Sequence, residues 1–249
     1  MVVSKYSANG NDFVIFHTFY KSDRSALARE ICHRQNGIGA DGLIVLVPHE
    51  RYDFEWQFYN SDGSEAAMCG NGSRAAAHYA YANGLAGAEM HFLTGAGVIG
   101  ASVEADMVLS ELTPPFMVQE HIEYNGKIWS LVNTGVPHLV HFTQNIAEFD
   151  IAEARELRYK YNANVNIAFV DGENLRVRTY ERGVENETLA CGTGMAACFY
   201  AANEKGLVKD SIEVYPASGE TLYLGVNDRT ITFKGGVKKV FVAEVVIGG

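Results

Sequence analysis

The stretch EAAMCGNGSRAAAHYAYANGL spans residues 65–85. A cysteine, Cys69, stands directly before the glycine pair Gly70 and Gly72, and an alanine-rich segment follows. This pattern predicts a helix that begins after the cysteine and ends at Gly84, because glycine is common where helices terminate. Cys69 would therefore lie at a helix N-terminus.

The same pattern occurs a second time in the chain. Residues 187–207 read ETLACGTGMAACFYAANEKGL, and placing Cys191 on Cys69 gives an offset of 122 residues. Eight of the 21 aligned positions are identical. The correspondence continues on both sides with small slips, so its period is about half the chain, which is far longer than a solenoid repeat. The sequence therefore predicts an internal duplication and two similar lobes.

Most of the remaining sequence has the periodicity of strands. Short β-branched or aromatic runs, such as 12–16, 43–47 and 175–180, are separated by Gly, Asn and Asp. A helix with side chains as small as those of 73–82 fits inside a curved sheet. We therefore predict an α+β fold of two pseudo-symmetric lobes. In each lobe a strongly curved, mostly antiparallel sheet wraps around a central helix, and the active site lies in the cleft between the lobes.

The prolines of TPPF (113–116) interrupt both helix and sheet, so they mark the expected boundary. The predicted lobes are 1–112 and 113–237, and a last strand within 238–249 is expected to complete the sheet of the first lobe. A second helix is predicted in each lobe, around 25–35 and 151–160.

Composition excludes several classes of function. The net charge is −10 and no basic run is present, which argues against a nucleic-acid partner. No apolar run approaches the roughly 20 residues that span a membrane, and the N-terminus is polar by its fourth residue. We expect a cytoplasmic protein without a membrane partner.

Four cysteines, Cys32, Cys69, Cys191 and Cys198, are scattered along the chain without a CxxC pair. We expect free thiols in a reducing compartment, with no metal site. Cys32 and Cys198 are interpreted as core residues, because free cysteine usually behaves as a small apolar side chain.

A helix N-terminus presents unpaired N–H groups and the positive end of the helix dipole. A thiol there ionises more readily, and the N–H groups can hold a carboxylate. Two such thiols on opposite faces of one α-carbon could remove a proton from one side and donate one from the other. This pattern favours racemase or epimerase chemistry that needs no cofactor.

Six segments together resemble the diaminopimelate epimerase family. They are ANGNDFVIF (8–16), GIGADGL (37–43), FYNSDGSEAAMCGNGSRAAA (58–77), NTGVPH (133–138), NVN (164–166) and YERGVENETLACGTGMAA (180–197). The resemblance implies a two-lobed, cofactor-independent isomerase that interconverts LL- and meso-diaminopimelate in lysine and peptidoglycan biosynthesis. It also suggests a homodimer.

The resemblance implies roles for individual residues. Cys69 and Cys191 would be the acid/base thiols, and His138 and Glu181 the polar residues that flank them. Arg182 would pair with the distal carboxylate, since its planar fork suits bidentate binding. The residues implied at the substrate are Asn11, Asn60, Gly70, Asn71, Gly72, Asn166, Glu181, Arg182, Gly192, Thr193 and Gly194. A turn role for any single asparagine, or a surface ion pair for Glu181 and Arg182, remains an alternative.

Three positions depart from the family pattern. Val136 stands where the family commonly has Asn, and Gly42 stands where glutamine is often found. The segment between Glu181 and Cys191 is one residue longer than usual. These changes bear on substrate orientation more than on the reaction type.

Two other readings stay open. Proline and hydroxyproline racemases also use paired cysteines, but they typically place the second one after DRSP, whereas here ETLA precedes Cys191. A two-lobed amino-acid-binding protein without catalysis is the alternative from another class, although both cysteines are retained. A pyridoxal enzyme is disfavoured because no lysine lies in the matched motifs.

Overall fold

The computed structural model of the chain describes residues 1–227 and 230–246. It divides into two compact units, unit 1 with Met1–Ser110 and Gly235–Gly249, and unit 2 with Glu111–Lys234. The last three residues of the predicted segment 238–249 lie outside the described part of the chain.

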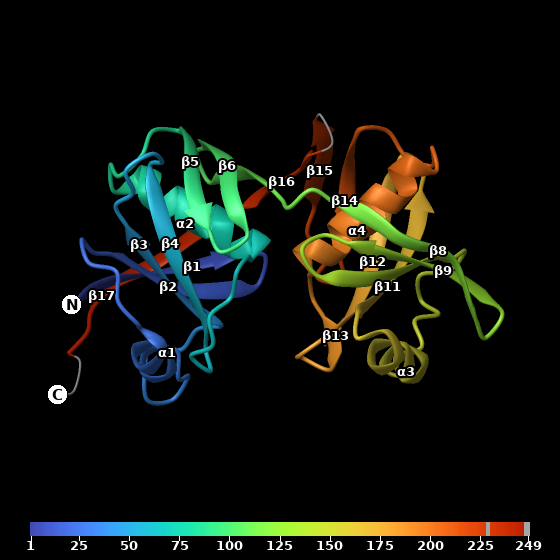
Figure 1. The fold of residues 1–249 in the computed structure, drawn as a ribbon, viewed down its shortest axis with the longest axis horizontal. Helices are drawn as coiled ribbons and strands as arrows, with labels where there is room; N and C mark the ends of the chain where they lie inside the picture. Colours follow the sequence, from blue (N-terminus) through green and yellow to red (C-terminus); the bar gives the residue numbers. More distant parts are fainter. Residues whose placement is uncertain (228–229, 247–249) are drawn as a thin grey trace. The chain divides into compact units, whose positions relative to one another are not determined.

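Unit 1 contains the first part of the chain and one strand from its C-terminal end (Figure 1). Its elements are β1 (Val2–Ala8), β2 (Asn11–His17), α1 (Ser25–Ile31), β3 (Gly42–Val47), β4 (Phe54–Asn60), α2 (Gly70–Ala82), β5 (Glu89–Thr94), β6 (Gly97–Glu104), β7 (Met107–Glu111) and β17 (Lys238–Glu244). The strands pair in the order β17-β1-β2-β3-β4-β5-β6-β7. The pairs β2–β3 and β4–β5 are parallel, and the others in this series are antiparallel.

Unit 2 repeats this arrangement. Its elements are β8 (Phe116–Tyr124), β9 (Lys127–Asn133), β10 (Pro137–Phe142), α3 (Ile151–Tyr161), β11 (Asn164–Asp171), β12 (Asn174–Glu181), β13 (Asn186–Thr188), α4 (Gly192–Glu204), β14 (Ser211–Tyr215), β15 (Leu222–Asn227) and β16 (Thr230–Gly236). The strands pair in the order β8-β9-β10-β11-β12-β14-β15-β16, and β13 forms a hairpin with β12. The parallel pairs are again the third and fifth, β10–β11 and β12–β14.

The two units therefore share one strand order and one pattern of strand directions. The predicted α+β class with duplicated, mostly antiparallel lobes is confirmed. The C-terminal strand β17 pairs with β1 as β8 pairs with β9, so β17 occupies in unit 1 the place that β8 occupies in unit 2.

A buried helix runs through the strands of each unit, α2 in unit 1 and α4 in unit 2 (Figure 1). Four alanines of α2 and four of α4 have no exposed surface: Ala75, Ala76, Ala77, Ala80, Ala196, Ala197, Ala201 and Ala202. Methyl side chains let the helix lie close to surrounding strands, which larger side chains would hold apart. The alanine-rich composition is therefore what allows a helix at the centre of each sheet.

The glycines predicted to end these helices do so. Gly84 and Gly206 have φ angles of +67° and +66°, which belong to the left-handed region that glycine adopts readily. The N–H of Leu85 donates to the Ala80 carbonyl and that of Leu207 to the Ala202 carbonyl, each at 2.9 Å. Both helices thus close in the same way.

The first predicted surface helix is shorter than expected. Helix α1 ends at Ile31, and the chain folds back so that Ile38 N–H donates to the Ile31 carbonyl at 2.9 Å. A Cβ at Gly37 would lie 2.3 Å from the carbonyl oxygen of Glu30. The prediction that this helix extends to residue 35 is wrong. The backbone turns after Ile31, because Gly37 and Ile38 pack against the end of the helix.

Candidate active site

Cys69 is the N-cap residue of α2. Its backbone is extended, and its thiol sulfur accepts a hydrogen bond from the Gly72 N–H at 3.4 Å. Gly70 and Asn71, the first two residues of the helix, are buried. The thiol therefore lies at the positive end of the helix, as the sequence predicts.

Cys191 is the N-cap residue of α4 in unit 2, also with extended backbone. Its sulfur lies 3.6 Å from the Thr193 hydroxyl, and the residue as a whole is 8% exposed. The Thr193 carbonyl accepts a hydrogen bond from the Thr134 hydroxyl at 3.2 Å. The two cysteines of the repeat thus occupy the same structural position in their units.

The walls behind the two helix starts differ in polarity. A Cβ at Gly72 would meet the apolar side chains of Ile44 and Trp56 at 3.4 and 3.5 Å. A Cβ at Gly194 would instead meet the Asn166 Oδ1 at 2.4 Å and the Thr179 Oγ1 at 3.0 Å. The duplication therefore conserves the helix start and changes what supports it.

The polar wall of unit 2 is a hydrogen-bond network. Its members His138 and Asn166 have no exposed surface. The Asn166 amide donates to the Leu139 carbonyl at 2.8 Å and lies 3.2 Å from His138 Nδ1, and its oxygen accepts from the Thr179 hydroxyl at 2.8 Å. Burial lowers the pKa of His138 to about 3, although the bond from Asn166 opposes that shift. His138 is therefore neutral at physiological pH. Sequence reasoning missed Thr179. A threonine within a strand is common, so nothing in the local sequence marks it as a functional residue.

A second network joins predicted site residues in unit 1. The Asn71 side-chain amide donates to Asn11 Oδ1 at 3.1 Å, and the Asn11 amide donates to Asp41 Oδ2 at 2.7 Å. Asn71 also accepts a hydrogen bond from the buried side chain of Arg74 at 2.7 Å. Arg74 was missed by sequence reasoning, although an arginine inside an alanine-rich helix is a usable signal.

The remaining predicted residues lie at strand ends. Asn60 ends β4, is exposed, and donates to the Ser64 hydroxyl at 3.0 Å. Glu181 ends β12 and accepts from the Thr188 hydroxyl at 2.8 Å, and the guanidinium of the next residue, Arg182, donates to the Asn162 carbonyl at 3.0 Å. These contacts hold the residues in place within their own units.

Two departures from the family pattern have a local structural reason. A Cβ at Gly42 would lie 2.6 Å from the Phe58 ring. A side chain as long as that of glutamine therefore does not fit at this position unless Phe58 moves. The long segment after Glu181 is a surface turn in which Glu185 has a φ of +58° and pairs with Arg158 at 2.7 Å. The additional residue thus falls where a turn can absorb it.

The other two cysteines are core residues, as predicted. Cys32 is 2% exposed and Cys198 has no exposed surface. Burial raises the pKa of the Cys32 thiol to about 12 and that of Cys198 still further. Neither thiol ionises at physiological pH.

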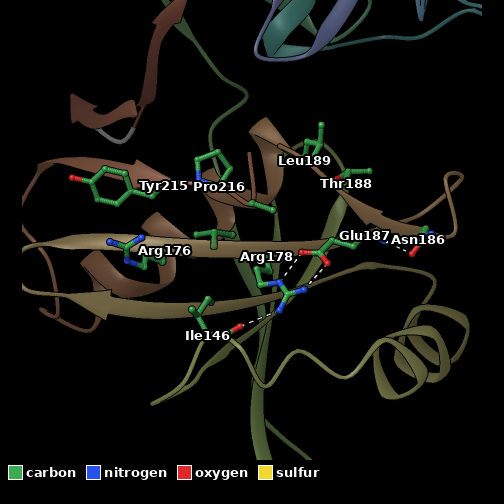
Figure 2. A pocket seen from close by; sticks show the side chains of 11 residues that line it. Ile146, Arg176, Arg178, Asn186, Glu187, Thr188, Leu189, Tyr215 and Pro216 are labelled. Atoms are coloured by element: carbon green, nitrogen blue, oxygen red, sulfur yellow. Dashed lines mark hydrogen bonds and ion pairs between the residues drawn. The ribbon is translucent and has the colours of Figure 1, made fainter. Parts of the chain in front are cut away.

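A hollow in unit 2 lies beside the segment that leads to Cys191. Figure 2 shows that the Arg178 guanidinium faces Glu187 and the Ile146 carbonyl within it. Both hydrogen bonds between Arg178 and Glu187 measure 2.6 Å. Since Arg176 is likewise paired with Asp171 at 2.8 Å, the cations of this hollow are neutralised by the chain itself. Glu187, one of the identical positions of the repeat, therefore has a structural contact here.

Comparison with known proteins bears on the identity of the site. The family model for diaminopimelate epimerase matches residues 3–118 and 130–240. A diaminopimelate epimerase from Nitratiruptor sp. is 64% identical over 242 residues, which are 97% of each chain. The chain belongs to the diaminopimelate epimerase family. The relative from Campylobacter jejuni is 56% identical over 96% of this chain and 97% of its own. The predicted family and the predicted enzyme class, an isomerase, are confirmed.

The fold is shared more widely than the family. A crystal structure of a probable proline racemase from Agrobacterium radiobacter superposes with a TM-score of 0.79 at 14% identity, covering 99% of this chain and 93% of that one. At that identity the likeness concerns the fold alone. No helix among the described residues is long and apolar enough to cross a membrane.

The buried histidine predicts a pH dependence of stability. Unfolding restores the ordinary pKa of His138, near 6.5, from about 3 in the folded chain. The unfolded chain therefore binds the extra proton, and stability is expected to fall as pH drops from about 6.5 toward 3, by up to about 1.4 kcal/mol per pH unit from this group. Urea unfolding from pH 7 to pH 4 checks this. His138→Gln should be less stable at pH 7 but show a smaller slope, and an unchanged slope would contradict the assignment.

Proposed function

We propose that this chain interconverts LL- and meso-diaminopimelate by proton transfer at one α-carbon, with Cys69 and Cys191 as the two acid/base groups. The observation that carries the proposal is the duplicated N-cap cysteine, which starts the buried helix of each unit. A single acid/base group would return the proton to the face from which it came. Inversion requires one acid/base group on each face of the α-carbon. The two cysteines of the duplication supply these two groups.

The chemistry requires one cysteine as thiolate and the other as thiol. The thiolate takes the α-proton, the C–H electron pair remains on carbon and delocalises into the α-carboxylate, and the second thiol donates its proton from the opposite face. Each turnover exchanges the two protonation states, so both directions use the same pair. The N–H groups of Gly70–Gly72 and Gly192–Gly194 are proposed to hold the carboxylate, because helix N-termini stabilise negative charge.

The other predicted residues fall into three proposed groups. Asn11, Asn60, Asn71, Thr193 and Arg182 are proposed to bind polar groups of the substrate, with Arg182 on the distal carboxylate. His138 and Asn166 have no exposed surface, and we propose that they act through the wall behind Gly194. Glu181 is proposed to lie beside the reacting thiols.

The substrate is argued from the family and from charge. Diaminopimelate carries a carboxylate and an ammonium group at each end, which suits a site with helix N–H groups and an arginine. The product would supply lysine and peptidoglycan biosynthesis. We propose that the reaction needs no cofactor, since thiols supply both proton transfers, and that the enzyme works in the cytoplasm, where the reducing conditions keep thiols free.

The direct test is solvent deuterium incorporation. Pure reduced protein in D₂O is expected to place one deuterium at an α-carbon of LL-diaminopimelate as it forms the meso isomer, detected by NMR and mass spectrometry. L-Proline and trans-4-hydroxy-L-proline serve as matched substrates for the racemase alternative. Exchange of a proline α-proton without exchange in diaminopimelate would overturn the substrate assignment, and no exchange in any of them would favour an amino-acid-binding protein.

We propose a homodimer that forms through β17. This strand pairs with β1, and its apolar side chains Val240, Phe241 and Val242 are 47%, 43% and 53% exposed. An exposed apolar edge strand favours pairing with another chain. Light scattering after size-exclusion chromatography is expected to give a dimer at micromolar concentration and a monomer for Phe241→Lys. The control Tyr20→Lys replaces another exposed aromatic residue and should stay dimeric; a monomeric wild-type protein would contradict the proposal.

A further inference from the structure

Asp41 lies directly before strand β3 and holds the side chain of Asn11, the first residue of β2. The Asn11 amide nitrogen donates a hydrogen bond to Asp41 Oδ2 at 2.7 Å. The Asn11 amide oxygen accepts a hydrogen bond from the Asn71 side-chain amide at 3.1 Å. The amide of Asn11 therefore lies between a carboxylate and an N–H group.

These two neighbours fix which way the Asn11 amide faces. A carboxylate accepts hydrogen bonds and has none to donate, so the amide nitrogen must face Asp41. A reversed amide would set its oxygen against the carboxylate and its nitrogen against the N–H group of Asn71. In the observed orientation both contacts are satisfied, and the second N–H of Asn11 remains for another acceptor.

Asp41 is itself held by several hydrogen bonds. Its Oδ1 accepts from the Arg34 guanidinium at 2.8 Å, and its Oδ2 accepts from the Asp12 N–H at 3.2 Å. The N–H of Asp41 donates in return to Asp12 Oδ1 at 2.9 Å. The same guanidinium also donates to both carboxylate oxygens of Asp12, at 3.0 and 3.1 Å. Arginine has only donors, so the oxygens that it faces act as acceptors.

A buried lysine completes this charged cluster of Lys5, Asp12, Arg34 and Asp41. Lys5 is 7% exposed, pairs with Asp12 at 2.7 Å, and donates to the Gly39 carbonyl. Burial alone would raise the pKa of Asp12, but hydrogen bonds from Arg34 and Lys5 bring it below its ordinary value. Taking charges out of water is costly, and apolar side chains often stabilise such positions as well or better.

Unit 2 builds the same part of the fold without these charges. The strand pairs β1–β2 and β2–β3 of unit 1 match β9–β10 and β10–β11 of unit 2 in direction and order. Phe13 lies opposite Gly42, as His138 lies opposite Asn164. By this register four polar residues of unit 1 correspond to apolar residues of unit 2: Lys5 to Leu131, Asn11 to Val136, Asp12 to Pro137 and Asp41 to Ala163.

The comparison separates what the fold needs from what Asn11 needs. Unit 2 forms the same strand pairs with apolar residues at these four positions, so the strand pairing does not require the charges. Where the asparagine is replaced by Val136, the carboxylate is replaced as well, by Ala163. The charged cluster thus accompanies the amide that it orients, and that amide contacts Asn71 in the first turn of α2.

We propose that Asp41 is a positioning residue for substrate recognition, which holds Asn11 so that this side chain presents an N–H group to the substrate. The partner of an N–H group is an acceptor. In an amino-acid substrate that acceptor is a carboxylate oxygen and not the ammonium group. The assignment of the substrate group rests on the proposed function, whereas the orientation of Asn11 rests on the contacts within unit 1.

The orientation is tested first without substrate. The two side-chain N–H signals of Asn11 are identified in a proton–nitrogen correlation NMR spectrum as the pair that Asn11→Asp removes. In wild-type protein one of these protons is expected to be shifted downfield, because hydrogen bonds to charged acceptors are short and strong. Asp41→Asn should reduce that shift. A wild-type spectrum in which neither proton is shifted would overturn the proposal.

Activity is tested by exchanging donor and acceptor. Asn11→Asp and Asp41→Asn are each expected to lower kcat/KM for LL-diaminopimelate at least about tenfold, because the first removes the N–H group and the second lets the amide turn. In the double variant, the new amide at position 41 can donate to the new carboxylate at position 11. The bond between the two side chains is then restored with reversed polarity, and the net charge is unchanged.

The double variant separates recognition from structure. Urea unfolding is expected to show it more stable than Asn11→Asp, which sets two carboxylates against each other. Its kcat/KM should nevertheless stay at least about tenfold below that of the wild type, since position 11 has no N–H group. Activity that returns together with stability would overturn the proposal, as would full activity of Asp41→Asn. If a variant does not fold by circular dichroism, the NMR measurement on wild-type protein decides the orientation.

Asp171→Asn is the matched control. Asp171 ends β11 in unit 2 and pairs with Arg176 at 2.8 Å, the distance between Asp41 and Arg34, and the two aspartate side chains are 43% and 40% exposed. Its replacement is expected to leave kcat/KM within about twofold of the wild type. An equal loss for Asp171→Asn and Asp41→Asn would refute a specific role of Asp41. Failure of the epimerase proposal would appear separately, as absent deuterium exchange in wild-type protein whose Asn11 signal is still shifted.

Discussion

Cys69→Ala and Cys191→Ala are each expected to lower the rate of epimerisation by about 10²- to 10⁴-fold. A positioned general acid or base typically accelerates a reaction by roughly this factor, and its removal loses that acceleration. The loss should be as complete for one cysteine as for the other, because inversion needs proton removal on one face and proton delivery on the other. Stereospecific conversion of LL- to meso-diaminopimelate, followed with pure reduced protein, measures it.

A finer signature distinguishes two bases from one. Each alanine variant retains only one of the two proposed acid/base thiols, so any residual exchange of the α-proton with D₂O should be confined to one stereoisomer. The two variants should choose opposite isomers. Inversion by either variant at a rate near that of the wild type would refute the two-base mechanism.

Cys198→Ala is the matched control. This cysteine lies on the same helix as Cys191 but is fully buried, and burial raises the pKa of its thiol. Its replacement removes a sulfur from the core and leaves both proposed acid/base groups intact. Near wild-type turnover is expected, with at most a modest loss of stability.

Gly194→Ala is expected to reduce both stability and activity strongly. The added methyl would lie 2.4 Å from Asn166 Oδ1 and 3.0 Å from Thr179 Oγ1. Neither atom can move freely. The Asn166 amide donates a hydrogen bond to the Leu139 carbonyl and lies against His138, and the Thr179 hydroxyl donates to Asn166. Forcing a methyl into such a packed site costs about 1–3 kcal/mol, and we expect kcat/KM to fall at least about a hundredfold as the helix start shifts.

Gly72→Ala is the matched control in the other unit. Its methyl would meet Cys69 Cβ at 3.3 Å and Ile44 Cδ1 at 3.4 Å, which small movements can relieve. Alanine also favours the helix by up to about 1 kcal/mol over glycine. Urea unfolding should therefore show a much smaller loss for Gly72→Ala. Equal destabilisation by the two changes would contradict the difference between the apolar and polar walls.

Much of the fold follows from local sequence. The helix starts after Cys69 and Cys191 and the helix ends at Gly84 and Gly206 depend on residues within one or two turns, so they could be predicted. Strands such as β6 and β8 were not predicted. The sequence of β6, GVIGASVE, contains two glycines, and β8 carries mostly exposed, polar side chains, with a register shift after Met117. Their pairing with neighbouring strands, which local propensity does not describe, makes them strands.

The candidate site residues also divide into those that local sequence predicts and those that only the folded chain brings together. The cysteines, glycines and asparagines of the candidate site stand in recognisable motifs, whereas Arg74 and Thr179 are linked to those residues only by contacts in the folded chain. Arg74 reaches Asn9, which is 65 residues away in the chain, and Thr179 reaches Asn166 on the neighbouring strand. Such contacts depend on which strands surround each helix.

The sequence by itself determined the duplication, the buried alanine-rich helices and a thiol at the start of each, because identity at a constant offset and helix signals are local properties of the chain. Only the tertiary structure decided that the two starts are supported differently. It places Ile44 and Trp56 against Gly72, and Asn166 and Thr179 against Gly194. Polarity at a buried point is set by the side chains that distant segments bring to it, and that choice is made by the packing of whole sheets around each helix.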